Sequence, residues 1–114
     1  MDIDGDGIFK ICVHLPEEFL ERMMDSVNSA MEPIYKGYDR AFGYSKAVGT
    51  WRPLDGSNPY KGAVGIIETT DEVRLEFAVH GRDLKAVVKI IADVHPYEEP
   101  AIDIIPMCSW KDVI

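Results

Sequence analysis

Residues 72–80 read EVRLEFAVH, and residues 81–96 continue as GRDLKAVVKIIADVHP. In the first stretch the apolar residues at every second position are Val73, Leu75, Phe77 and Val79. In the second stretch the apolar residues at three- and four-residue steps are Leu84, Val87, Val88, Ile91 and Val94. Alternation is typical of a strand with one buried face, and the longer period is typical of an amphipathic helix. We predict a strand over 72–80, and a helix that begins at Arg82 or Asp83 and that Pro96 stops.

A stiff segment follows this helix, His95–Ile104, with the sequence HPYEEPAIDI. Its two prolines fix their own φ angles and favour extended geometry in the residues before them. We expect a last strand from about Ala101 to Ile105, ended by Pro106. The segment is therefore a rigid corner between a helix and the final strand, and polar corners of this kind often carry binding residues.

The part of the chain before residue 72 contains three further predicted elements and a long loop. A nearly continuous apolar run predicts a strand over Ile8–Leu15, and an amphipathic helix follows from Pro16 and ends before Pro33. A strand or distorted hairpin arm is expected near Tyr38–Val48. The stretch Trp51–Gly65 is rich in turn residues, and loops of this length are often functional.

The predicted order β-α-β-β-α-β defines the fold class. With right-handed crossovers it gives an α+β, ferredoxin-like sandwich, in which a four-stranded antiparallel sheet carries two helices on one face. The other face stays uncovered, so we expect a homo-oligomer that buries it. The single domain spans residues 8–107, with an acidic N-terminal tail at 1–7 and a C-terminal tail at 108–114.

Composition narrows the function classes. The chain has 114 residues, 46% of them hydrophobic, and a formal net charge of -8. This charge disfavours nucleic acid and anionic membrane surfaces as partners. Cys12 and Cys108 lack the spacing of a zinc or redox motif, so we expect them to be reduced. There is no long apolar stretch and no cationic leader, and we expect a cytoplasmic protein.

The N-terminal sequence Asp2–Gly7, DIDGDG, resembles the first half of an EF-hand calcium loop. The twelfth position of such a loop needs a bidentate carboxylate, and here that position is Val13 in a predicted strand. A solvated acidic tail is therefore the preferred interpretation.

The long loop and the corner carry the residues that we consider for ligand or partner binding: Arg52, Asn58, Tyr60, His95, Tyr97 and Glu99. The loop has two interpretations, to which we give equal weight. It forms a lip over a small ligand, or it is a cluster of turns whose aromatic residues pack on a neighbouring subunit. No nucleophile has a base at catalytic spacing, so no catalytic residue is assigned. A small hydrolase or isomerase with its site under the 52–61 loop is kept as a third interpretation.

Glu98 shares the strand parity of Ile102 and Ile104 in the extended corner. We therefore expect Glu98 to be partly buried and to form a structural ion pair, with Arg52 and Arg74 as the candidate partners.

No metal site and no cofactor are expected within one subunit. In an extended chain His95 and Glu99 lie about 13 Å apart, too far to share one ion. A divalent metal ion held between subunits is the alternative, and its candidate ligands are His80, His95 and Glu99.

Two stretches of the chain resemble a known family. They are Gly49–Gly62, GTWRPLDGSNPYKG, and His95–Asp103, HPYEEPAID, and Tyr38–Arg40 is a third, weaker match at agreeing spacing. They resemble the domain inserted in many bacterial Nif-three-like dinuclear-metal-centre proteins, which also occurs as a free-standing short protein. One position departs from the pattern, because the family often has Cys where this chain has Ala41.

The resemblance implies a ferredoxin-like fold related to CutA and PII proteins, which typically form trimers through their sheets. The family's dinuclear metal ligands belong to flanking domains, so no metal chemistry is carried over. The resemblance, together with the lack of a nucleophile that has a base at catalytic spacing, favours a non-catalytic, oligomeric binding or regulatory module. Its expected partners are other copies of the chain, with a trimer first, and a small molecule or protein. A CutA-like divalent metal-ion binding or tolerance protein is the alternative.

Overall fold

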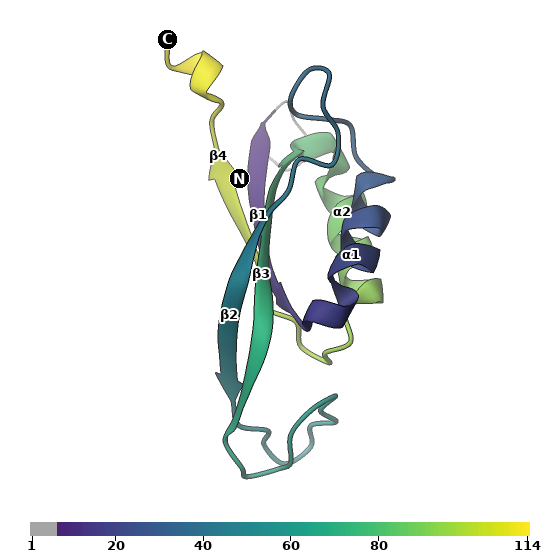
Figure 1. Cartoon of the computed structure of the whole chain (residues 1–114), viewed down its shortest axis with the longest axis vertical. Helices are drawn as coiled ribbons and strands as arrows, with labels where there is room; N and C mark the ends of the chain where they lie inside the picture. Colours follow the sequence, from purple (N-terminus) through teal and green to yellow (C-terminus); the bar gives the residue numbers. More distant parts are fainter. Residues whose placement is uncertain (1–6) are drawn as a thin grey trace.

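A computed structural model describes residues 7–114 of the chain. Four antiparallel strands form one sheet in the order β2-β3-β1-β4, and two helices lie on one side of it (Figure 1). The elements are β1 Ile8–Leu15, α1 Leu20–Asn28, β2 Gly43–Trp51, β3 Glu68–His80, α2 Gly81–Val94 and β4 Ile102–Met107. Short 3-10 turns precede α1 at Glu17–Phe19 and follow β4 at Trp110–Asp112. The predicted α+β fold is confirmed.

The hydrophobic core lies between the sheet and the helices. On the sheet side it consists of alternating residues of the two central strands: Phe9, Ile11, Val13, Leu15, Val73, Leu75, Phe77 and Val79. On the helix side it consists of Leu20, Met23, Val27, Leu84, Val87 and Ile91. This is the apolar alternation seen in the sequence, and it fixes which face of the sheet the helices cover.

Three of the four strands have bounds that differ from the predicted ones. β2 begins at Gly43 rather than near Tyr38, because the preceding loop is tied to α1. β3 begins at Glu68, four residues early, and this outer part was not predicted because residues 68–72 pair with β2 alone and are all polar. Pro106 lies inside β4 instead of ending it, which an edge strand tolerates.

The loop before β2 is held by Asn28 at the end of α1. The Asn28 Oδ1 accepts a hydrogen bond from the backbone N–H of Arg40 at 2.9 Å, and its Nδ2 donates to the Asp39 carboxylate at 3.1 Å. Arg40 has a left-handed φ of 52° and pairs with Asp25 through its guanidinium. These contacts stabilise a backbone conformation that side-chain-bearing residues rarely adopt.

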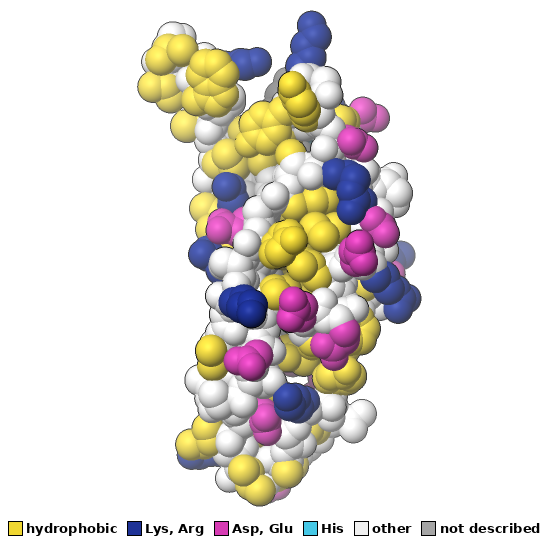
Figure 2. Space-filling model, in the orientation of Figure 1, with side chains coloured by type: hydrophobic (Ala, Val, Ile, Leu, Met, Phe, Trp, Pro, Cys, Tyr) yellow, Lys and Arg dark blue, Asp and Glu magenta, His cyan; other side chains and the backbone are white. Residues whose placement is uncertain are grey.

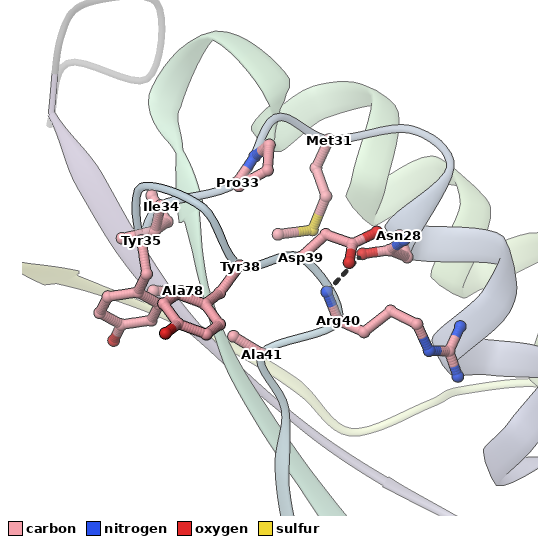
Figure 3. Close-up of a pocket in the computed structure, with 10 residues that line it drawn as sticks. All are labelled: Asn28, Met31, Pro33, Ile34, Tyr35, Tyr38, Asp39, Arg40, Ala41 and Ala78. Atoms are coloured by element: carbon pink, nitrogen blue, oxygen red, sulfur yellow. Dashed lines mark hydrogen bonds between the residues drawn. The ribbon is translucent and has the colours of Figure 1, made fainter.

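A small cavity lies beneath this loop. Figure 3 shows the Tyr35 and Tyr38 rings side by side near Ala78, with the hydrogen bond between Asn28 and Arg40 to their right. The volume is about 10 Å³, which leaves room for about one water molecule. We therefore treat it as a packing feature.

Apolar side chains remain exposed at both ends of the long axis. Figure 2 shows them on the C-terminal turn at the upper left and on the loop at the lower tip of the β2–β3 hairpin. At the C-terminal end they are Trp110, Val113 and Ile114, and in the loop they are Leu54, Val64, Ile66 and Ile67. Charged side chains of both signs lie between the two ends.

Several sequence expectations concern the chain ends and the cysteines. The Asp2–Asp6 carboxylates, weighed as calcium ligands, lie outside the described residues. The two cysteines are not bonded to each other, and Cys12 is buried in β1 while Cys108 is exposed after β4. Across residues 7–114, every helix is too short or too polar to cross a membrane.

Replacing Ile91 by Ala tests the core between α2 and the sheet. Ile91 is fully buried, so truncation leaves a cavity and should lower the free energy of unfolding by about 2–5 kcal/mol. Lys89→Ala, at an exposed position of the same helix, should change it by less than about 0.5 kcal/mol. Urea unfolding followed by circular dichroism measures both. Equal effects of the two changes would contradict this core.

Candidate binding pocket at the end of the β2–β3 hairpin

A pocket of about 600 Å³ lies where the hairpin extends past the end of β1. The loop after β2 and the corner after α2 meet at this end of the molecule (Figure 1). The strands contribute His14, Gly49, Trp51, Glu72 and Asp103 to the lining, and the loop and corner contribute Arg52, Tyr60, Lys61, Tyr97, Glu98 and Glu99. This volume is in the range of small-molecule sites.

Glu72 is the buried charged group of the pocket, with an exposed fraction of 5%. Its Oε2 accepts a hydrogen bond from the Tyr97 hydroxyl at 2.7 Å, and its Oε1 lies 3.6 Å from His14 Nδ1. The carboxylate also lies against Gly49 of β2, where a Cβ atom would overlap it. A side chain at position 49 would therefore have to displace the Glu72 carboxylate, although the φ of Gly49 itself is unremarkable.

Tyr97 joins the corner to β3 through that hydrogen bond. Burial, and then the contact with the Glu72 carboxylate, raise the pKa of Tyr97 well above its usual range. The phenol therefore stays protonated and serves as a hydrogen-bond donor. Because an unpaired buried carboxylate is costly, this donor stabilises the folded state.

His95 fixes the corner against the end of β1. Its Nδ1 accepts a hydrogen bond from the Tyr97 backbone N–H at 3.2 Å, so the Nε2 proton is donated to the His14 carbonyl oxygen at 2.6 Å. The side chain is buried, and burial lowers the pKa of His95 below 6.5. His95 is therefore a neutral structural residue whose two ring nitrogens are both used.

Aromatic rings from three segments meet around Tyr97. The Trp51 ring lies 5.3 Å from the Tyr97 ring and the Tyr60 ring lies 5.9 Å from it, measured between centroids. The Trp51 Nε1 donates to the Lys61 carbonyl oxygen at 3.2 Å, which closes the loop over the strand end. Ring pairs at these separations stabilise one another beyond their buried area.

The pocket brings together most of the binding residues expected from the sequence. Arg52, Tyr60, Tyr97 and Glu99 line it. Asn58 lies beside it and takes part through its backbone. His95 packs behind Tyr97, with its ring 4.9 Å from the Tyr97 ring, and supports the pocket without lining it.

The expected ion pair of Glu98 is not formed. Glu98 is exposed, and its Oε2 accepts the backbone N–H of Asn58 at 2.8 Å. Arg74 instead lies 3.6 Å from Glu76 and 3.1 Å from the Cys12 sulfur, on the helix-free face of the sheet. The parity argument fails because the corner is not a regular strand before Ile102. Glu98 therefore ties the corner to the hairpin loop through a backbone amide.

The three candidate metal ligands do not come together within one subunit. His80 pairs with Ile8 at the start of β1 and contacts the Pro33 carbonyl oxygen at 3.2 Å, whereas His95 lies at the far end of β1. Within residues 7–114 no three His, Cys, Asp or Glu side chains are grouped to hold an ion.

Sequence reasoning missed Glu72 and His14 as members of this site. The alternation in residues 72–80 puts Glu72 on the side opposite the apolar residues, and the apolar run over Ile8–Leu15 does not single out His14. The signal in the sequence is Gly49, whose missing side chain admits the Glu72 carboxylate, but it is readable only once the register of β2 and β3 is known.

Three curated relatives with matching sequence are named GTP cyclohydrolase 1 type 2 homolog. The Bacillus subtilis protein is 35% identical over 90% of this chain, and the Staphylococcus epidermidis protein is 33% identical over 87%. The Halalkalibacterium halodurans protein is 29% identical over 96% of the chain. The chain spans only 27% of the length of the first two and 29% of the third. No family model matches the chain.

Solved structures place the fold. A Bacillus cereus protein related to NIF3 superposes with a TM-score of 0.78 and 26% identity, over 91% of this chain and 26% of that one. The chain has a CutA/PII-like fold and is similar to one part of NIF3-related proteins. CutA from Archaeoglobus fulgidus superposes with a TM-score of 0.67 and 16% identity, over 93% of this chain and 90% of that one. The Bacillus subtilis GlnK–ATP complex superposes with a TM-score of 0.63 and 11% identity, over 90% of this chain and 86% of that one.

Removing the Tyr97 hydroxyl tests the contact that joins the corner after α2 to β3. Tyr97→Phe leaves the buried Glu72 carboxylate without its hydroxyl donor, and should cost about 1–3 kcal/mol of unfolding free energy. Tyr60→Phe changes a half-exposed ring of the same cluster and should cost less than about 0.5 kcal/mol. Chemical denaturation measures both, and a Tyr97→Phe protein as stable as the wild type would contradict the contact.

The buried His95 makes stability depend on pH. Because its folded pKa is lowered, the unfolded chain takes up a proton as the pH falls below about 6.5 while the folded chain does not. Stability should therefore decrease as the pH falls through this range. Melting curves measured at about pH 7.5 and about pH 5.5 should show that His95→Gln loses less stability at the lower pH than the wild type does. The Gln amide can still donate a hydrogen bond to the His14 carbonyl oxygen. If His95→Gln lost as much stability between these two pH values as the wild type, the pH dependence would not come from His95.

Proposed function

We propose that this CutA/PII-like domain is a binding or regulatory module that acts as a homo-oligomer and carries out no chemical step. The single observation that carries the proposal is the hairpin pocket, which six segments of the chain build around a buried carboxylate. Polar groups that would serve as acid or base are engaged with one another, as in the bond between Tyr97 and Glu72. Such an arrangement favours recognition of a ligand over activation of a nucleophile.

The fold supports a binding role. GlnK, which shares the fold at 11% identity, was solved in complex with ATP, so a protein of this architecture holds a small molecule. The relatives' name refers to a cyclohydrolase, but the chain corresponds to little more than a quarter of those proteins. We therefore assign the domain the binding step and leave the chemistry to the larger proteins.

A metal-handling role is the alternative, because the Archaeoglobus CutA is described as a divalent cation tolerance protein. We prefer the binding module. The candidate ligands His80 and His95 lie at opposite ends of β1, and His95 uses both ring nitrogens within its own chain. A metal-independent module is accordingly the proposal, with no cofactor required.

Self-association through the helix-free face is the second part of the proposal. Ile105 of β4 pairs with Lys10 and lies on the face opposite the core, where its side chain is about half exposed. Ala78 and Cys12 lie on the same face. Burying this face against other copies removes apolar surface from water, and we propose a trimer.

Light scattering behind size exclusion tests the assembly. The wild-type chain should run at about three times 12.8 kDa, and Ile105→Asp should shift it towards the monomer by placing a charge in the interface. Ala86→Asp introduces the same charge on the exposed side of α2 and should leave the mass unchanged. A monomeric wild type, or equal behaviour of the two variants, would contradict the assembly.

A further inference from the structure

The pocket contains a buried carboxylate with no permanently charged partner. Glu72 is 5% exposed, and its contacts are the Tyr97 hydroxyl and the His14 ring. Over residues 7–114 no Lys or Arg lies within ion-pair distance of it. A carboxylate removed from water ordinarily has a cation or several N–H donors beside it. Glu72 therefore favours a positively charged group that enters from the pocket.

The other charges of the lining point the same way. Glu98, Glu99 and Asp103 add three carboxylates around the opening, against the basic side chains of Arg52 and Lys61. The Lys61 ammonium donates to the Thr70 hydroxyl at 2.6 Å and is thus partly engaged within the hairpin. The excess of negative charge attracts cations and disfavours phosphates or other anions.

The walls suit an organic cation rather than a bare ion. Trp51, Tyr60 and Tyr97 form a continuous aromatic cluster in which neighbouring centroids lie within 6 Å. Aromatic faces attract ammonium groups electrostatically and bury the methylene groups attached to them. A metal ion would need several oxygen or nitrogen ligands converging on one point, and the described residues offer no such group.

We infer that the pocket binds a linear aliphatic polyamine. One ammonium group lies against Glu72, the alkyl chain packs along Trp51 and Tyr97, and a further ammonium lies near Glu98 and Glu99 at the opening. A volume of about 600 Å³ accommodates such a chain. The inference deepens the proposed function and rests on it, since it names the class of ligand that the binding module takes.

Calorimetric titration of the full chain tests the ligand class. Spermidine and hexanediamine should bind once per subunit at about 0.15 M salt, and hexanediol, which has the same length without the charge, should not bind. Glu72→Gln and Trp51→Leu should each weaken spermidine binding at least about tenfold. Glu21→Gln removes an exposed carboxylate of α1 and should leave the affinity unchanged.

Folding of the variants is checked by thermal melting. If Glu72→Gln does not fold, the double change Glu98→Gln and Glu99→Gln replaces it, because both side chains are exposed. Three results would overturn the polyamine assignment: no binding of either amine, equal binding of hexanediol, or equal affinity of all variants. The last result would mark a nonspecific effect of net charge.

A parallel titration with ATP separates this inference from the proposed function. ATP binding that Trp51→Leu abolishes, without amine binding, would overturn the ligand class and retain the pocket as a binding site. A monomeric chain that binds neither the amines nor ATP would overturn both.

Discussion

The rest of the structure depends on where β1 ends. β1 stops at Leu15, whereas β3 begins at Glu68 and pairs with β2 alone until Val73. The open side of β3 is filled by the corner after α2, which His95 fastens to the His14 carbonyl and Tyr97 fastens to Glu72. Backbone and carboxylate groups that would otherwise be buried without partners are satisfied in this way. These contacts hold the β2–β3 hairpin where it extends past β1, and the pocket lies at this point.

Sequence patterns predicted the parts of the fold that have one buried face. The alternation in Val73–Val79, the bounds of β1 and the second amphipathic helix agree with the structure, because each is dictated by contact with one core. β2 was harder to predict because its side chains are largely exposed on both faces. The early start of β3 was missed because residues 68–72 are all polar and give no apolar alternation.

The site was predictable in its location but not in its chemistry. The turn-rich loop and the proline-bracketed corner indicated where polar and aromatic residues would gather, and the structure places Arg52, Tyr60 and Tyr97 there. The pairing of Tyr97 with Glu72 depends on how two segments 25 residues apart cross in space, which periodicity does not encode. Glu98 was assigned a buried role by strand parity, which holds only where the backbone is a regular strand.

Pro106 has a consequence for how copies of this sheet can meet. It occupies β4, an edge strand, and proline lacks the N–H that a neighbouring strand would need as a donor. The row of backbone hydrogen-bonding groups on the outer edge of β4 is thus interrupted. This hinders the edge-to-edge addition of strands by which sheets grow into fibres. Association through the helix-free face of the sheet does not need these backbone groups. A closed assembly is therefore favoured over an open-ended one.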